Sequence, residues 1–347
     1  MGPYFARRLL LILPTFVGIT FVVFLITRFV PGGPIEQAIL RMQAGGGRGE
    51  GGAAAGGIAD AGAGSKIPES VMKELEKRYG FDKPVPVAYA NWLWDTVRLD
   101  LGKSYKYNVP VIDVITTRFP VSIYFGLIGF TLAYMVCIPL GVLKAVKHGS
   151  PFDVVSSLVV FAGYSVPGWA LGALLLVFFG GGEFLSWIPL GGFRSPGWSE
   201  MGWWDRILDQ AHHTIAPVLC YAIGSFATLT VLMKNALMEN LGQDYVRAAF
   251  AKGLPERRVI FVHALRNSLI PVCTGLGHSL GLLMAGSYLI EFTFNIPGLG
   301  FLGYTSIIER DYAVVMGVLV INALLVLLGN ILSDVFYVLA DPRIRFT

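Results

Sequence analysis

Six long apolar runs, separated by polar segments, set the pattern of hydrophobic and polar positions along this chain of 347 residues. A helix needs roughly 20 apolar residues to cross about 30 Å of hydrocarbon, and each run is long enough to do so. The pattern therefore predicts an all-α integral membrane protein with six transmembrane helices, at about residues 9–29, 121–143, 154–179, 214–236, 268–291 and 313–339.

The composition agrees with a bilayer location and narrows the range of partners. Only 14% of the residues are charged, whereas a soluble domain carries roughly a quarter. The net charge of +4 is not gathered into a Lys/Arg-rich tract, so nucleic acid is not expected as a partner. The three cysteines lie far apart in apolar runs, where they fit buried core positions rather than disulfides.

The distribution of basic residues predicts the orientation, because short cytoplasmic segments are enriched in Lys and Arg. Such residues gather before the first run, after the second, after the fourth and after the sixth, whereas the opposite short segments hold only Arg194, Arg206 and Arg310. Both termini are therefore expected in the cytoplasm. The first run is too long for a signal-peptide core, so residues 1–30 are predicted to keep the N-terminus and first transmembrane helix.

Residues 31–120 then form a long extracytoplasmic segment, and residues 121–347 form a core of five helices. Within the long segment, 17 of the 21 residues at 44–64 are Gly or Ala, which predicts a flexible loop with nothing to bury. Two amphipathic helices are expected after it, at 68–78 and about 86–99. Trp92 and Trp94 in the second helix fit interfacial anchors, although a ligand platform is the alternative.

The most informative polar segment is the loop 238–267, between the fourth and fifth runs. Asp244 suits a helix N-cap, a short helix is predicted over 245–252, and Gly253 suits its end. Pro255 can open a second helix, predicted to reach Asn267.

Ala248 and Ala249 leave the first of these helices narrow, so that it can enter a groove on another protein. Arg247 and Lys252 would then make charged contacts at the rim of that groove. A basic loop that merely enforces orientation would explain the charges, but it would not explain the Ala-Ala-x-x-x-Gly spacing.

This loop resembles the coupling loop of ABC-importer permeases, whose pattern is E-A-A-x3-G-x9-I-x-L-P. Here the pattern reads Arg247-Ala248-Ala249-x3-Gly253-x9-His263-Ala264-Leu265-Arg266, and these departures are similar to those of the oligopeptide/dipeptide branch. Further matches to that branch are Asp100-Leu-Gly-Lys-Ser104, Phe294-Asn-Ile-Pro-Gly-Leu-Gly300, Arg310-Asp-Tyr312 and Asp341-Pro-Arg-Ile-Arg345. The long external segment looks most like the microcin C/Yej type of peptide permease.

The resemblance implies a type I ABC importer permease fold in a bacterial inner membrane. The chain would form half of a translocation pathway for oligopeptides or peptide-like compounds, with a second homologous permease, two ABC ATPase subunits or one fused ATPase, and a periplasmic peptide-binding protein. ATP and Mg would bind to the ATPase partners, with no cofactor in this chain. The residues expected to couple to the ATPase are Tyr245, Arg247, Ala248, Ala249, Lys252, Gly253, Leu254 and Arg257.

Candidates for the pathway or its gate are Glu291, Pro167 and Asn295. Glu291 ends the fifth run, where an intramembrane carboxylate could contact cargo or a gate. No catalytic or metal-binding residues are expected, because the His212-His213 pair lacks a third ligand nearby. A stand-alone secondary transporter or channel is the alternative, but it would need buried charges near the midplane, and the apolar runs hold almost none. The cargo itself is not specified by the sequence.

Overall fold

The computed structural model describes residues 2–29, 82–180, 185–284 and 286–340. Within these ranges the regular structure is helical, with one isolated antiparallel bridge between Lys103 and Pro110. The stretch 44–64 and the predicted helix 68–78 lie outside them. The chain divides into two compact units. The first comprises Met1–Pro14, Thr116–Gly303 and Ile321–Thr347, and the second comprises Thr15–Ile115 and Tyr304–Val320.

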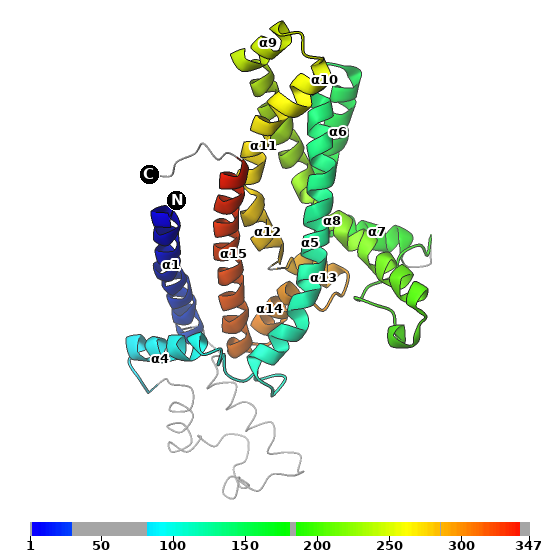
Figure 1. Ribbon diagram of the computed structural model, residues 1–347. Coiled ribbons are helices and arrows are strands. Elements are labelled where there is room, and N and C mark those ends of the chain that lie inside the picture. The colour runs from blue at the N-terminus through cyan, green and yellow to red at the C-terminus, as the bar shows by residue number, and fades with distance from the viewer. Residues whose placement is uncertain (1, 30–81, 181–184, 285, 341–347) are drawn as a thin grey trace, which may run out of the picture. The chain divides into compact units, whose positions relative to one another are not determined.

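Four helices in the described ranges are long and apolar enough to cross a membrane, and each contains one of the predicted runs. They are α1 (Gly2–Phe29), α5 (Val111–Val146), α8 (Trp203–Leu241) and α15 (Tyr312–Ala340), as Figure 1 shows. α5 has 36 residues and α8 has 39. At about 1.5 Å per residue both are longer than the hydrocarbon layer is thick, so both extend into the polar regions.

The predicted span 154–179 is not one helix. It is divided into α6 (Pro151–Ser165) and α7 (Gly168–Phe179), which meet at an angle of 90°. Pro167 supplies the reason, because proline has no backbone N–H and disfavours a helical conformation in the residue before it. Val166 is accordingly extended, with a ψ of 118°. Counted as one span, this bent pair raises the number of candidate spans from four to five.

The predicted span 268–291 is divided further. It comprises α11 (Leu265–Thr274), α12 (Leu276–Met284) and α13 (Tyr288–Thr293). These helices have 10, 9 and 6 residues, so none reaches the length of a span on its own. In the described residues the fold is therefore all-helical with four or five candidate spans, and the prediction of six transmembrane helices is not confirmed.

Shorter helices connect these elements. They are α4 (Val85–Val97), the 3-10 helix η1 (Trp198–Glu200), α9 (Asp244–Ala251), α10 (Glu256–Arg258), the π-helix η2 (Val259–Ala264) and α14 (Leu299–Ile308).

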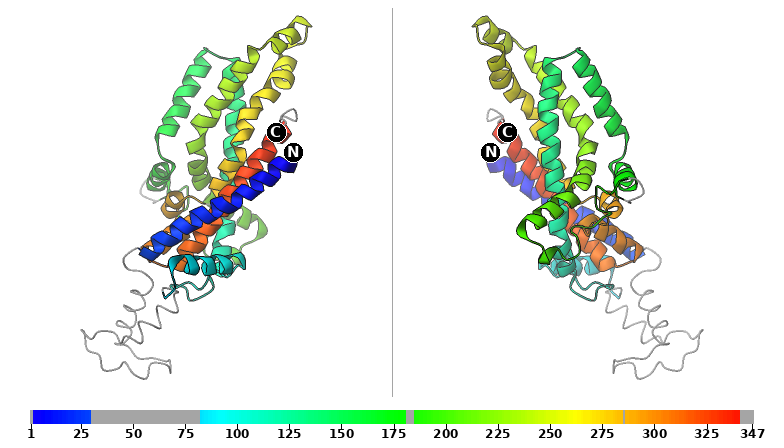
Figure 2. Two further views of the ribbon diagram at one scale, coloured as in Figure 1. Left: turned by 90° about the vertical axis from the view of Figure 1, so that its left-hand side faces the viewer. Right: turned by 90° about the vertical axis from the view of Figure 1, so that its right-hand side faces the viewer.

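The first unit is built around α8, against which α6, α7 and α11 pack. Both views of Figure 2 show α5 and α6 running beside it. Glycines let α5 approach α8 closely. A Cβ added at Gly141 would lie 2.6 Å from the Cβ of Met233, and one added at Gly129 would lie 2.8 Å from that of Tyr221. Such contacts leave room only for hydrogen at these two positions.

In the second unit, α4 is anchored on the second half of α1. The Tyr89 hydroxyl lies 2.8 Å from Thr20 Oγ1 and donates to the Val17 carbonyl at 2.9 Å. Trp92 packs against Phe24, with ring centroids 5.9 Å apart, so it is part of the fold. Trp94 is exposed, and of the two predicted anchors it is the one free to meet a membrane surface.

Candidate functional site

The segment predicted to dock on another protein forms helix α9, Asp244–Ala251, within one residue of the predicted bounds. In Figure 1, α9 and α13 lie toward opposite ends of the first unit. Gly253 has a φ of +77°, a conformation that L side chains rarely adopt, so glycine suits the turn that ends α9. Pro255 caps the next helical stretch, as expected.

One face of α9 is buried against its own chain. Val246 is fully buried and Ala249 is 8% exposed, and both belong to a core cluster that also contains Met233, Leu237 and Val259. Leu254 packs against the same cluster. Complete burial of an aliphatic side chain stabilises by roughly 1.5–3 kcal/mol, so α9 is firmly attached to α8 and η2.

The opposite face of α9 is open. Tyr245, Arg247, Ala248, Phe250 and Lys252 are all exposed. The two alanines therefore differ in role, because only Ala248 is available to a partner, whereas Ala249 gives α9 its close contact with the core. Both alanines were expected to form the narrow side of the helix that enters a groove on another protein, but only Ala248 lies on the exposed face. Phe250 was not among the predicted coupling residues. The signal that could have found it is a large aromatic side chain on a polar loop helix.

The charges of this segment are solvated. Arg247 lies 3.6 Å from Asp244, and both side chains are exposed, at 74% and 100%. Lys252 and Arg257 are exposed as well. An ion pair of this kind contributes little to stability, which leaves the basic side chains available for a partner. Tyr245 is oriented by its hydroxyl, which donates to Asn240 Oδ1 at 2.7 Å.

A buried ionic cluster ties together α5, α6 and α8. Lys234 Nζ donates to both oxygens of Asp153, at 2.8 and 2.7 Å, and Lys144 Nζ lies 3.1 Å from Oδ1. The side chains of Lys144 and Asp153 are only 2% and 7% exposed. Lys144 also donates to the hydroxyls of Ser156 and Ser157. The cluster joins the consecutive helices α5 and α6 to the distant α8, and this pairing was not predicted from the sequence.

Glu291, the first gate candidate, is completely buried in α13. Ser122 Oγ donates to its Oε1 at 2.8 Å, the Tyr221 hydroxyl lies 3.3 Å from the same oxygen, and the Phe301 N–H donates to Oε2 at 2.7 Å. These partners are hydroxyl and backbone groups of the protein itself. The predicted residue is thus placed in a hydrogen-bond network that the sequence did not reveal.

The other two gate candidates are exposed. Pro167 begins the turn into α7, and the neighbouring Gly168 packs close to Ile290 of α13. Asn295 follows α13 with a φ of +48°, a left-handed conformation that asparagine tolerates well. The three candidates therefore lie on neighbouring segments, but only Glu291 is enclosed by the fold.

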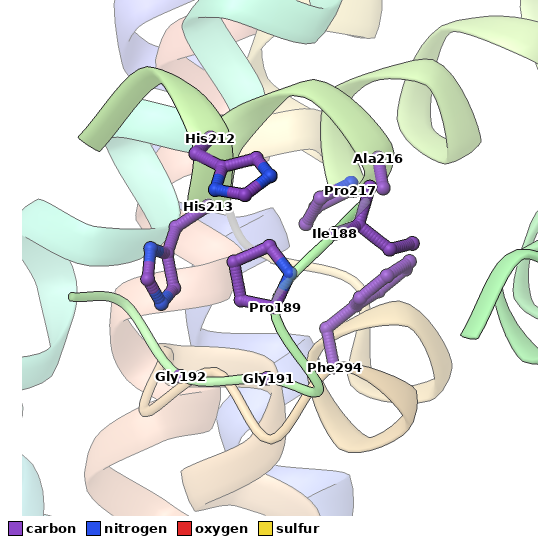
Figure 3. Close-up of a pocket in the computed structure, with 9 residues that line it drawn as sticks. All are labelled: Ile188, Pro189, Gly191, Gly192, His212, His213, Ala216, Pro217 and Phe294. Carbon is purple, nitrogen blue, oxygen red and sulfur yellow. The ribbon is translucent and has the colours of Figure 1, made fainter. Parts of the chain in front are cut away.

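A small pocket lies beside this region, between the 188–192 segment, α8 and the ring of Phe294, as Figure 3 shows. The rings of His212 and His213 both line it, and His213 Nδ1 lies 3.0 Å from the Asp209 carbonyl. In the described part of the chain, no group of three or more His, Cys, Asp or Glu side chains is placed to hold a metal ion.

The chain thus combines long and broken membrane helices with a loop helix that is attached to the core on one face and open on the other. Residues 137–346 match the family described as "Binding-protein-dependent transport system inner membrane component". The chain belongs to this family, which confirms the resemblance noted in its sequence. It is a multi-pass membrane protein and a permease subunit, the non-catalytic membrane component of an ABC transport system.

Individual relatives match over the whole chain. It is 40% identical to "Inner membrane ABC transporter permease protein YejB" of Escherichia coli O157:H7, over 100% of this chain and 99% of that protein. It is 39% identical, with the same coverage, to "Peptidoglycan transport system permease protein YejB" of Agrobacterium fabrum. The identity to "Oligopeptide transport system permease protein AppB" of Bacillus subtilis is 34%, covering both chains fully.

Membership of this family implies ATPase and binding-protein partners for the chain. The alternative of a transporter or channel that works alone does not agree with it.

Proposed function

We propose that the chain is one half of the translocation pathway of an ATP-driven importer for peptides or peptide-like compounds, and that its ATPase partners drive it through α9. The printed names of the relatives support the cargo class, because they include an oligopeptide and a peptidoglycan transport system. The other half is a second, homologous permease. A binding protein delivers cargo at the outer face, and ATP and Mg bind in the ATPase subunits.

The coupling role is supported by the difference between the two faces of α9, one of which is buried against the core while the other is exposed. Its inner face is held by Val246 and Ala249 in a core shared with α5 and α8, while Tyr245, Arg247 and Ala248 remain exposed. A force applied to the exposed face is therefore passed to the long helices without a flexible joint. The remaining contacts are assigned to Lys252, Gly253, Leu254 and Arg257, which shape or flank the turn after α9.

The proposal includes the topology. We infer six spans, with α6 and α7 as one bent span and α11, α12 and α13 together as another. The broken helices are suited to line a pathway, because irregular backbone at membrane depth is tolerated where it is enclosed by protein or faces a water-filled cavity. The short basic segments support a bacterial inner-membrane topology in which both termini and α9 face the cytoplasm and lipid surrounds the outer surface of the bundle.

Substitution on the open face of α9 tests the coupling. Ala248→Trp is expected to leave the permease inserted but to reduce co-purification of the ATPase subunits at least tenfold, because the indole would fill the narrow side of the helix. Ala90→Trp is the matched control, since Ala90 is also an exposed alanine on a short helix. Undiminished ATPase recovery with Ala248→Trp would contradict docking on this face.

The transport function is tested with the complete complex in proteoliposomes. ATP-dependent uptake of labelled oligopeptides or muropeptides is expected only when the permeases, the ATPases and the loaded binding protein are all present. Uptake by this chain alone under an ion gradient would overturn the proposal.

A further inference from the structure

The carboxylate of Glu291 connects both ends of a hairpin to two long helices. The hairpin, residues 286–301, contains α13, the loop that follows it and the first three residues of α14. Close to Glu291 lie Ser122 of α5 and Tyr221 of α8, which are both buried. Backbone N–H groups of the hairpin also reach the network.

The two hydroxyls act as relays. At one end of the hairpin, the Ser287 N–H donates to the Tyr221 hydroxyl at 3.0 Å, and that hydroxyl donates to Glu291 Oε1. At the other end, the Leu299 N–H donates to Ser122 Oγ at 2.6 Å, and Ser122 donates to the same oxygen. Because each hydroxyl receives a hydrogen bond from a backbone N–H, its own proton is directed toward the carboxylate.

The directions of these hydrogen bonds require that both carboxyl oxygens of Glu291 act as acceptors. Oε1 receives the two hydroxyl protons, and Oε2 receives the Phe301 N–H at 2.7 Å. A glutamine would place an NH2 group at one of these positions, where it would face another donor. The site therefore discriminates between two side chains of nearly equal size by hydrogen-bond polarity.

The hairpin backbone is wrapped closely around the carboxylate. A Cβ added at Gly298 would lie 2.3 Å from the carboxyl carbon, and one added at Gly286 would lie 2.5 Å from Oε1. With no exposed surface on Glu291, cargo has no access to it in this conformation. Phe294 holds the opposite side of the hairpin, since its ring packs against Gly172 and its carbonyl accepts the Gly192 N–H at 2.8 Å.

We propose that Glu291 is a positioning residue that locks both ends of the 286–301 hairpin to α5 and α8, so that the hairpin moves with these helices and Glu291 never contacts cargo. The consequence for transport rests on the proposed function. The consequence for the hairpin does not, because it concerns the stability of three backbone hydrogen bonds in the isolated subunit.

Amide hydrogen exchange of the full chain in lipid nanodiscs tests the lock. Glu291→Gln is expected to accelerate exchange at Ser287, Leu299 and Phe301 at least tenfold, and Glu200→Gln, at an exposed glutamate, is expected to change nothing there. Two further variants serve if Glu291→Gln does not fold. Tyr221→Phe should accelerate exchange mainly at Ser287, and Ser122→Ala mainly at Leu299. Unchanged exchange in Glu291→Gln, or equal acceleration at both ends in both relay variants, would overturn the lock.

Transport kinetics in the reconstituted complex test whether Glu291 positions the hairpin or binds cargo. Glu291→Gln should lower the kcat of uptake at least fivefold and leave KM for peptide within twofold, because a positioning residue does not bind cargo. A raised KM with unchanged kcat would instead indicate a cargo contact and refute the proposal. If the wild-type complex takes up no peptide, the proposed function fails, while the exchange measurements still decide whether Glu291 locks the hairpin.

Discussion

Replacing Asp153 with asparagine is expected to destabilise the first unit strongly, because the carboxylate balances the buried ammonium group of Lys144 and the partly buried one of Lys234. Lys144, Asp153 and Lys234 together carry a net charge of +1, and their side chains are 2%, 7% and 15% exposed. Asp153→Asn keeps the shape of the side chain but raises the net charge to +2 in a site with little access to water.

The size of this loss in stability depends on the hydrogen-bond acceptors and the solvent contact that each lysine keeps after the substitution. Breaking a buried ion pair by removing one partner costs about 3–5 kcal/mol, because it leaves an uncompensated charge. Lys144 keeps three acceptors, the hydroxyls of Ser156 and Ser157 and the Asp153 carbonyl, at 2.7–2.8 Å. Lys234 is partly accessible to solvent. We therefore expect a loss near the lower end of the range, about 3 kcal/mol in the free energy of unfolding.

Reversible unfolding in mixed detergent micelles measures this loss. Asp244→Asn provides the matched control, because Asp244 is fully exposed, and a surface change of this kind should stay within about 0.5 kcal/mol. The double variant Asp153→Asn/Lys234→Met restores the original net charge and should recover part of the loss. A cost below about 1 kcal/mol for Asp153→Asn, or no recovery in the double variant, would refute the reasoning.

Two further predictions use the same unfolding measurement. Asp311 accepts a hydrogen bond from the Ser104 hydroxyl at 2.5 Å and caps the start of α15. Asp311→Ala should therefore lower the free energy of unfolding by about 2–3 kcal/mol, because the helix loses its cap and the buried Ser104 hydroxyl loses its acceptor. A change below about 0.5 kcal/mol would contradict this. Gly141→Ala should cost about 1–3 kcal/mol because its Cβ meets Met233, whereas Gly224→Ala, with open space around the added Cβ, should be neutral or stabilising. The opposite ranking of the two alanine variants would show that close packing does not set their stability.

The structure gives a physical reason for the sequence stretches shared with the permease branch. Asp311 of the Arg310-Asp-Tyr312 stretch bonds to Ser104, at the end of the Asp100–Ser104 stretch. Gly298 and Gly300 of a third stretch leave space for the carboxylate of Glu291. These stretches are far apart along the chain, but each supplies one side of a tight contact.

Local patterns predicted the helices that need no tertiary contact to be recognised. Apolar runs of 20 residues or more satisfy their own backbone only as helices in lipid, so the cores of α1, α5, α8 and α15 followed from hydropathy. The short helix α9 followed in the same way from its terminal glycine. The predicted N-cap at Asp244 was wrong by one residue, because Gln243 occupies the N-cap position and Asp244 is the first helical residue. The family followed from motif spacing, which is a property of local sequence, and the coupling role of α9 stays a prediction from the same motif.

Hydropathy could not place the breaks in the other two runs, because apolar residues on either side of a break look the same. Pro167 explains why the helix is interrupted there, but the 90° angle of the bend and the division into α11, α12 and α13 were seen only in the structure. The side of α9 that faces the core was also ambiguous, since Ala248 and Ala249 are identical in chemistry and differ only in direction.

By itself, then, the sequence determined that this is a helical membrane protein of the permease family and predicted a short helix in one of its loops, because hydropathy and motif spacing are local properties. Only the tertiary structure decided which residues meet. It brought Glu291 to Ser122, 169 positions away, and Lys234 to Asp153, 81 positions away. The physical reason is that the packing of whole helices brings buried polar groups together, and the order of residues along one chain does not show which helices pack against each other.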